Sequence, residues 1–183
     1  MQKDRKNAVR QTIIDTATRL FYKQGYVNTG INQIIEESGV VKSTLYATFR
    51  TKEDILMEYL ISSGASTDAA LKAASDKGKD PKAKVLAVFD YLIDLVQEKE
   101  YYGCNFLNII SEIPAEAERV IKQIQKQKNG VRTLFFTILE PIGKEDLADN
   151  IYVLFEGALI ANKVHHKVWP VESAKKIAAK ILS

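Results

Sequence analysis

The sequence predicts an all-α fold, and three observations support this prediction. First, apolar residues recur every three or four positions in most segments, which is the spacing of one helical face. Second, only nine glycines and four prolines occur in 183 residues, too few for a chain made mainly of turns. Third, no stretch between turn residues alternates apolar and polar side chains, as a half-buried strand would. We therefore expect about nine helices and no sheet.

The composition is that of a folded, water-soluble protein, with 46% hydrophobic and 27% charged residues. A single cysteine, Cys104, excludes an internal disulfide, and no set of Cys and His residues has the spacing of a zinc site. His165 and His166 are adjacent, so their side chains diverge on a helix and make a poor metal pair. No apolar run approaches the roughly 18 residues of a membrane span. We expect a cytoplasmic protein without a metal, a cofactor or a membrane partner.

The first helix is expected within "AVRQTIIDTATRLFYKQGY". Ile13, Ala17, Leu20 and Phe21 recur there at the spacing of one helical face. Gly25 is expected to end this helix, because glycine takes the left-handed conformation after a helix at little cost.

A second, short helix is expected to follow Thr29, which can cap it. Ile31, Ile34 and Ile35 would form its buried stripe, and Gly39 would end it. The sequence thus predicts a short amphipathic helix that stops at a tight turn.

The third helix is expected to begin after Val40, with Leu45 and Phe49 turned inward because they lie four residues apart. The opposite face is then short, polar and basic, and it is formed by Lys42, Ser43, Tyr46 and Ala47.

Two further helix starts have recognisable caps. Thr51 and Asp54 form a capping-box pattern before the apolar residues 55–60, and a break of this fourth helix at 62–66 is left open. Asp80 and Pro81 open a helix expected to run to about residue 100. The remaining apolar segments are expected to be a short one after Gly103 that ends at Pro114, and helices at about 115–140, 145–167 and 170 to the C-terminus.

Positive charge is concentrated in the first part of the chain. Residues 1–52 hold nine Lys and Arg against four Asp and Glu, a net +5, whereas residues 53–183 hold seventeen against nineteen, a net −2. This asymmetry favours a front end that binds a polyanion, although a basic helix can equally be a solvated surface.

Two helices joined by a tight glycine turn and preceded by a third form a helix-turn-helix module. The segments "IIDTATRLFYKQGY" and "TGINQIIEESGVVKSTLYATFRTKEDIL" resemble the N-terminal domain of the TetR family of bacterial transcriptional regulators over residues 13–56. The resemblance implies a DNA-binding domain at 1–52 and an effector-binding and dimerisation domain of helices at 53–183. The matching positions include Gly25, Thr29, Gly39, Val40, Thr44, Leu45, Tyr46, Phe49, Lys52 and Glu53.

The resemblance also implies roles for individual DNA-binding residues. Residues expected to contact bases are Lys42, Ser43, Thr44, Ala47 at a thymine methyl, and Asn32 near the edge of the site. Residues expected to contact phosphates are Thr29, with its backbone N–H, Tyr46, Thr48 and Lys52.

Two of these roles have structural alternatives, and one position departs from the family. Thr29 could act only as a cap, and Tyr46 could simply pack beside Lys42. Val41 stands where family members often have a small polar residue at the start of the recognition helix, and valine cannot cap. The helix could therefore start later, or Val41 could contact DNA or the core.

In the family that the chain resembles, the C-terminal bundle encloses a small-molecule pocket. Aromatic residues in the corresponding segments suggest a mostly apolar or aromatic effector, although core packing explains each of them equally simply. Asn105, Asn108 and Glu112 share a helical face and could supply polar contacts, or form a solvated face. The candidate effector-binding residues are Phe89, Tyr101, Tyr102, Cys104, Asn105, Phe106, Asn108, Phe136, Tyr152 and Phe155.

Dimerisation would be required to place two recognition helices on two half-sites of a palindromic operator. The expected interface is an apolar stripe near the C-terminus, although the same stripe could instead fill the core of the monomer. Its residues are Ile151, Leu154, Ala158, Leu159 and Asn162, with Phe155 on the same face.

The sequence thus predicts a homodimeric, sequence-specific repressor that a small effector releases from its operator. In one alternative, oxidation or alkylation of Cys104 switches the same scaffold, although a buried structural cysteine is the simpler interpretation. In another, the chain binds DNA without specificity. An enzyme with Cys104 as nucleophile and His165 or His166 as base lacks an orienting third group, so no catalytic residue is expected.

Overall fold

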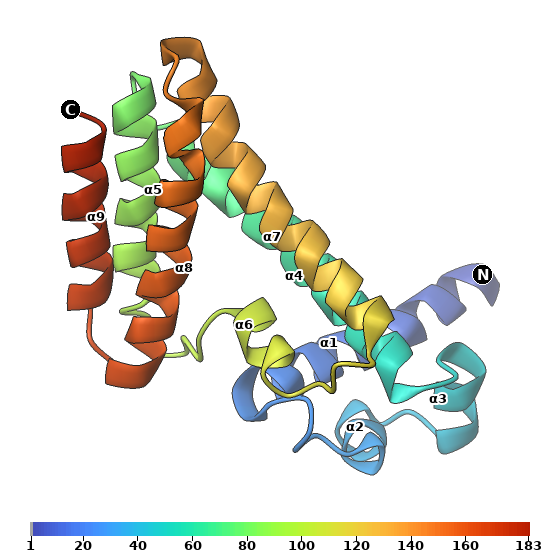
Figure 1. Cartoon of the computed structure of the whole chain (residues 1–183). Helices are drawn as coiled ribbons and strands as arrows, with labels where there is room; N and C mark the ends of the chain where they lie inside the picture. The colour runs from blue at the N-terminus through green and yellow to red at the C-terminus, as the bar shows by residue number, and fades with distance from the viewer. Residues whose placement is uncertain (1) are drawn as a thin grey trace. The chain divides into compact units, whose positions relative to one another are not determined.

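The computed structural model describes residues 2–183, with side chains from residue 6 onward. Over this range the chain forms nine α-helices and two short 3-10 helices, and no strand, as the sequence predicts (Figure 1). None of the described helices is long and apolar enough to cross a membrane. The elements are α1 Gln2–Gln24, α2 Ile31–Ser38, α3 Lys42–Thr48, α4 Lys52–Ser75, α5 Pro81–Leu95, α6 Asn105–Ile110, α7 Glu118–Leu139, η1 Glu140–Ile142, η2 Glu145–Leu147, α8 Ala148–His165 and α9 Trp169–Ile181.

The chain divides into two compact units, each built from two separate segments. The N-terminal unit contains residues 1–63 and 105–124, and the C-terminal unit contains residues 64–104 and 125–183. These units differ from the predicted division at 52/53, because α6 and the first turns of α7 group with the first three helices. Helices α4 and α7 each contribute residues to both units.

The core of the N-terminal unit forms on the predicted face of α1. Ile13, Ala17, Leu20 and Phe21 are all buried there. Gly25 then follows the helix with a φ of +90°, a conformation that an L side chain rarely adopts. The sequence prediction of both the buried face and the helix end is confirmed.

Helices α2 and α3 bury one side each, with Ile34 and Leu45 fully buried. The predicted cap of α2 is wrong, however. The residue before the helix is Gly30, which has no side chain to cap with, and the fully buried Thr29 hydroxyl instead donates a hydrogen bond to the Gly25 carbonyl at 2.7 Å. Thr29 therefore stabilises the turn between α1 and α2 rather than the start of α2.

The predicted capping box at the start of α4 is present. The Asp54 N–H donates to the Thr51 hydroxyl, and the Thr51 N–H donates to the Asp54 carboxylate, both at 3.1 Å. The helix then continues without the break that the small and polar residues 62–66 left open. Gly64 is buried in this stretch, so tertiary packing outweighs its low helix propensity.

The C-terminal unit contains α5, α8 and α9, which pack side by side (Figure 1). Asp80 caps α5 by accepting a hydrogen bond from the Ala83 N–H at 2.8 Å, and the helix ends at Leu95, before the predicted end near residue 100. Phe155 of α8 lies between Phe89 and Phe135, with edge-to-face ring contacts at 6.4 and 5.8 Å. Aromatic packing thus fills the centre of this unit.

A candidate nucleic-acid interface on the N-terminal unit

Helix α3 has one buried side and one exposed polar side. Leu45 and Phe49 anchor it to the core, as predicted, while 43% of the Tyr46 surface stays exposed. The rest of the exposed side is formed by the predicted base-contacting residues Lys42, Ser43, Thr44 and Ala47. A helix whose buried side is packed on the core and whose exposed side carries small polar and cationic side chains can fit into the major groove of DNA.

The start of α3 carries no side-chain cap. Val41 is the residue before the helix, with φ −63° and ψ 140°, and 69% of its surface is exposed. Helix α3 therefore begins at Lys42, and Val41 does not belong to the core. Because the valine side chain cannot accept a hydrogen bond, the first N–H groups of α3 lack a side-chain acceptor at this end.

The start of α2 is also open, but Thr29 does not offer the phosphate contact that the sequence predicts. Its side chain is fully buried, its hydroxyl is bonded to Gly25, and its N–H donates to the Tyr26 carbonyl at 3.2 Å. The uncapped backbone after Gly30 remains accessible beside Asn32, whose side chain is exposed. Helix N-termini of this kind attract anions through their free N–H groups.

Two other predicted phosphate contacts are engaged within the N-terminal unit. The Thr48 hydroxyl donates to the Thr44 carbonyl at 2.8 Å. The Lys52 ammonium donates to the Tyr26 carbonyl at 2.5 Å and lies 4.1 Å from the centre of the Tyr26 ring. Burial lowers the pKa of Lys52, with Glu112 opposing this effect. The predicted role of Lys52 as a phosphate contact is therefore corrected. Its ammonium instead holds the turn before α2.

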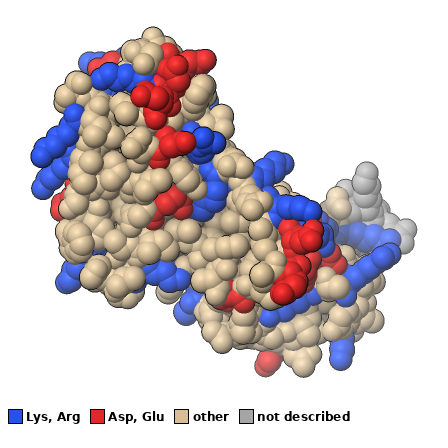
Figure 2. All heavy atoms as spheres, in the orientation of Figure 1, with Lys and Arg blue, Asp and Glu red and all other residues tan. Residues whose placement is uncertain are grey.

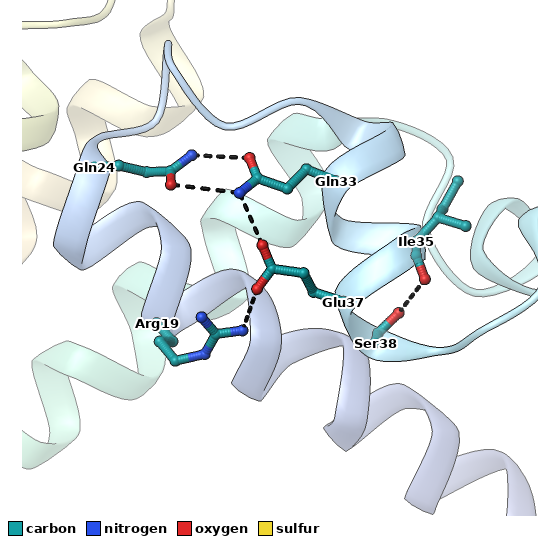
Figure 3. Close-up of polar contacts among 6 residues, drawn as sticks. All are labelled: Arg19, Gln24, Gln33, Ile35, Glu37 and Ser38. Atoms are coloured by element: carbon teal, nitrogen blue, oxygen red, sulfur yellow. Dashed lines mark hydrogen bonds and ion pairs between the residues drawn. The ribbon is translucent and has the colours of Figure 1, made fainter.

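A polar network holds α2 against α1 (Figure 3). Glu37 accepts hydrogen bonds from Arg19 at 2.6 Å and from Gln33 at 2.8 Å, and Gln33 in turn accepts one from Gln24 at 2.9 Å. The Arg19 hydrogen bond, followed by that of Gln33, holds the pKa of the Glu37 carboxyl below its ordinary value. Four polar side chains thereby fix the angle between the first two helices.

The turn between α2 and α3 is also held by local hydrogen bonds. The Ser38 hydroxyl donates a hydrogen bond to the Ile35 carbonyl at 3.2 Å (Figure 3). The same hydroxyl accepts one from the Val40 N–H at 3.4 Å. Gly39 lies between them with a φ of +65°, and its N–H donates to the Glu36 carbonyl. This glycine turn brings α3 around, as the sequence predicts.

Glu112 fixes the turn that precedes α2 and was not predicted to do so. Its carboxylate accepts a hydrogen bond from the Val27 N–H at 2.8 Å. The same carboxylate lies 2.7 Å from the position that a Cβ on Gly25 would occupy. Glu112 therefore belongs to the N-terminal unit, and the prediction that it shares an effector-binding face is not supported.

Exposed cations stand at both ends of α3. Lys42 opens the helix, and Arg50 follows it, exposed and without an ion pair in the described chain. Figure 2 shows that Lys and Arg elsewhere on the visible face are interspersed with carboxylates, and Arg10 is indeed paired with Glu58 at 2.6 Å. Sequence reasoning missed Arg50, although an unpaired cation just after the recognition helix is a usable signal.

The comparisons with known proteins agree with this geometry. The family model described as bacterial regulatory proteins of the tetR family matches residues 13–59, which contain the second half of α1, all of α2 and α3, and the first turns of α4. Residues 13–59 are thus similar to that family. The proteins that the chain resembles are described as transcriptional regulators.

Two curated relatives match less than half of the chain. The uncharacterized HTH-type transcriptional regulator YxaF of Bacillus subtilis is 40% identical over 73 residues, which cover 39% of this chain and 38% of that protein. LmrA of the same organism is 52% identical over 50 residues, only 27% of each chain. The matched region thus spans well under two thirds of these relatives.

Solved structures resemble the fold over nearly the whole chain. A TetR-family transcriptional regulator from Streptomyces coelicolor has a TM-score of 0.81 at 25% identity, covering 93% of this chain and 90% of that one. The reduced form of Escherichia coli NemR has a TM-score of 0.84 at 20% identity, covering 93% and 95%. The helical C-terminal unit therefore shares the fold of these structures.

The residues predicted to contact an effector do not gather in one place. Asn105, Phe106 and Asn108 belong to the N-terminal unit, where Phe106 and Asn108 are buried, and the other seven belong to the C-terminal unit. Phe89 and Phe155 take part in the aromatic packing described above. Phe136 and Tyr102 are exposed, and Tyr101, Tyr102, Asn162 and His166 line a pocket of about 300 Å³.

Cys104 lies in a half-buried polar cluster of the C-terminal unit. The Lys128 ammonium is 3.4 Å from the Cys104 sulfur and forms an ion pair with Glu156 at 2.7 Å. Burial alone would lower the pKa of Lys128, but Cys104 and Glu156 together hold that pKa above its ordinary value. Burial, followed by the charge of Glu156, raises the pKa of the nearby Tyr152. The described residues contain no group that could hold a metal ion.

The predicted dimer interface is wrong for most of its residues. Ile151, Ala158, Leu159 and Asn162 are buried within the monomer, and the Asn162 side chain donates to the Lys167 carbonyl at 2.9 Å. Leu154 is half-buried at a groove between α8 and α9. The stripe fills the chain's own core, which is the alternative that the sequence left open.

Proposed function

We propose that this chain is a transcriptional repressor that binds operator DNA through α3. The observation that supports this most directly is the two-sided character of α3, with Leu45 and Phe49 buried and the polar face from Lys42 to Ala47 exposed. The match of residues 13–59 to the family model supports the same function. Lys42, Ser43 and Thr44 would contact base edges, and Ala47 would contact a thymine methyl.

Phosphate contacts would come from the periphery of the same surface. Tyr46 and Arg50 are exposed beside the base-contacting face, and Asn32 lies at the open start of α2. Backbone N–H groups after Gly30 and Val41 add neutral donors with a favourable helix dipole. These groups would fix the position of the protein on the duplex, whereas the centre of α3 would supply specificity.

Operator binding of this kind is proposed to need a homodimer, formed through the outer faces of α8 and α9. Val153, Ile160 and Val164 follow one another on α8 at helical spacing, with exposed fractions of 65%, 46% and 68%. Ile177 of α9 is also exposed, and a groove of about 390 Å³ lies between the two helices. Contiguous exposed aliphatic side chains of this extent mark protein interfaces. A two-fold dimer implies a palindromic operator.

Release from the operator is proposed to follow binding of a small, mostly apolar effector to the C-terminal unit. The effector must bind the DNA-incompetent arrangement more tightly, and a typical coupling free energy is about 1–3 kcal/mol. Thermodynamic linkage requires the operator to weaken effector binding by the same factor.

A second candidate trigger is covalent modification of Cys104 by an oxidant or an alkylating electrophile. The specific observation in its favour is Lys128, whose ammonium lies 3.4 Å from the sulfur. The thiolate is the reactive form of cysteine, and a neighbouring ammonium can pair with it. Treatment with hydrogen peroxide or N-ethylmaleimide should then release wild-type protein from DNA and leave Cys104→Ser bound; equal release of both would exclude this trigger.

The DNA-binding proposal is tested by selecting the purified protein on a randomised duplex at near-physiological salt and sequencing the bound pool. An enriched palindrome, lost in a Lys42→Ala, Thr44→Ala double variant that still folds, is the expected result. Enrichment of no sequence by a folded dimer would overturn specific readout and support the non-specific DNA-binding alternative.

A further inference from the structure

The most exposed large apolar side chain of the described chain is that of Val41, with 69% of its surface in solvent. Val41 lies directly before α3, and the residues that follow it, Lys42, Ser43 and Thr44, are exposed and polar. A valine beside three polar residues does not form the contiguous apolar patch that marks a protein interface. Val41 is therefore a small apolar group at the end of a polar row.

The position of Val41 relative to α3 is fixed by its backbone. Its carbonyl accepts hydrogen bonds from the Thr44 N–H at 2.9 Å and from the Leu45 N–H at 3.1 Å. Leu45 is fully buried, so the core of the N-terminal unit holds this end of the helix. A β-branched side chain also has few allowed χ1 rotamers. Val41 would thus lose little conformational freedom on contact with a partner.

Helix stability does not explain a valine at this position. The residue before a helix often supplies a side-chain oxygen to the free N–H groups, but Val41 makes no such hydrogen bond. Serine, threonine, asparagine or aspartate would stabilise the start of α3 better. Core packing does not explain the valine either, because the side chain is exposed. A contact with a bound partner accounts for both observations.

The DNA-binding arrangement proposed above supplies an apolar partner for this side chain. The N-terminal end of a recognition helix contacts base edges in the major groove, and Val41 directly precedes the three residues proposed to read bases. Most groups that bases present in the major groove are hydrogen-bond donors or acceptors. The apolar group among them is the C5 methyl of thymine.

From this arrangement we infer that Val41 determines specificity by selecting thymine, through its 5-methyl group, at one position of each operator half-site. The inference rests on the proposed function, because it assigns one base of the operator that α3 would read. It is distinct from the proposed contact of Ala47 with a thymine methyl. Ala47 lies six residues further along, about 9 Å on a helix, which exceeds the roughly 3.4 Å between base pairs.

The test removes the methyl group from the DNA. Each thymine of the selected palindrome is replaced in turn by deoxyuridine, in both half-sites together, which keeps the base pair and deletes only the 5-methyl group. Operator affinity is measured by fluorescence anisotropy at constant salt. At the position read by Val41, wild-type affinity should fall about tenfold, because one buried methyl group contributes about three- to fourfold in each half-site.

Variants of the protein identify which thymine Val41 contacts. Val41→Ala should bind the thymine operator about tenfold more weakly than wild type and should not respond to deoxyuridine at that one position. Its response at a thymine read by Ala47 should remain. Val27→Ala is the matched control, because Val27 is also an exposed valine of the N-terminal unit, at 62%, but lies outside α3. This control should respond to deoxyuridine as wild type does at every position.

A serine at the same position separates DNA reading from helix stability. Val41→Ser should raise the urea midpoint of the protein, because serine can cap α3. It should nevertheless weaken binding to the thymine operator and abolish the response to deoxyuridine. If Val41 had only a structural role, operator affinity would rise or stay constant with the added stability, and the response to deoxyuridine would be unchanged.

Failure of this inference can be told apart from failure of the proposed function. The inference is overturned if wild type and Val41→Ala respond equally to deoxyuridine at every position, or if no thymine of the half-site responds. Both results leave the proposed function intact, because a palindrome has then been selected. A protein that selects no palindrome fails the proposed function, and the inference fails with it.

Discussion

Helices α3 and α8 each bury one face in their own unit, but the faces that they expose differ in chemistry. Helix α3 exposes Lys42, Ser43 and Thr44, whereas α8 exposes Val153, Ile160 and Val164. The first surface suits the polar edges of a nucleic acid, and the second suits another apolar protein surface. The comparison teaches that the exposed face, rather than the helix itself, distinguishes the two roles.

The largest expected effect comes from removing the anchor behind α3. Leu45→Ala should destabilise the N-terminal unit by about 2–5 kcal/mol, because Leu45 is fully buried and its loss leaves a cavity. Urea unfolding followed by circular dichroism measures this loss. Leu45→Met, which conserves volume, should cost less than about 1.5 kcal/mol; a similar cost for both variants would show that α3 is not anchored by packing.

A charge on the outer face of α8 should break the proposed dimer while leaving the monomer folded. Ile160→Asp should weaken dimerisation by at least about 30-fold, the equivalent of about 2 kcal/mol at an interface centre. Sedimentation equilibrium measures the dimer dissociation constant. Ile142→Asp changes an equally exposed isoleucine outside α8 and α9, so a comparable loss of dimer there would place the interface elsewhere.

Substitutions on the polar face of α3 should separate specificity from general affinity. Lys42→Ala should change the preferred base at one operator position by about 1–3 kcal/mol. Arg50→Ala should weaken binding to all duplexes and lower the salt slope by about 1. Anisotropy titrations on operator variants at several salt concentrations distinguish these outcomes. Identical behaviour of Lys42→Ala and Arg50→Ala would contradict the proposal that Lys42 contacts a base and Arg50 a phosphate.

The smallest expected effect concerns the polar network beneath α2. The Glu37 pKa lies below its ordinary value of 4.5 in the folded protein, so the ionised carboxylate adds stability above that pH. This contribution is lost as the pH falls through the lowered folded pKa. Glu37→Gln should therefore be less stable than wild type at neutral pH and equal to it in acid, as measured by urea midpoints. Glu36→Gln, which removes an exposed carboxylate of the same helix outside this network, is the matched control.

The sequence predicts the N-terminal helices well because each has apolar residues on a single face. Ile13, Leu45 and Phe49 could be assigned to the core from spacing alone. On α8, apolar residues occur on both faces, so periodicity could not separate the buried Ile151 from the exposed Val153. The predicted dimer stripe failed for this reason.

Contacts between residues far apart in the sequence could not be predicted either. The Lys52 ammonium donates a hydrogen bond to the Tyr26 carbonyl, 26 positions away. Glu112 accepts one from the Val27 N–H, 85 positions away. Thr29 was predicted to cap α2 because it lies just before that helix. Its hydroxyl instead donates a hydrogen bond to the Gly25 carbonyl in the preceding turn. Each of these depends on tertiary contacts that a single sequence does not contain.

The N-terminal unit depends on Glu112 and Arg119, which lie far downstream in the chain. Glu112 accepts the Val27 N–H, and Arg119 forms an ion pair with Asp54 at 2.7 Å. During synthesis, α1 to α3 therefore leave the ribosome before either partner exists. The helices proposed to contact DNA gain these two contacts only after residue 119 has emerged, when about two thirds of the chain has been made.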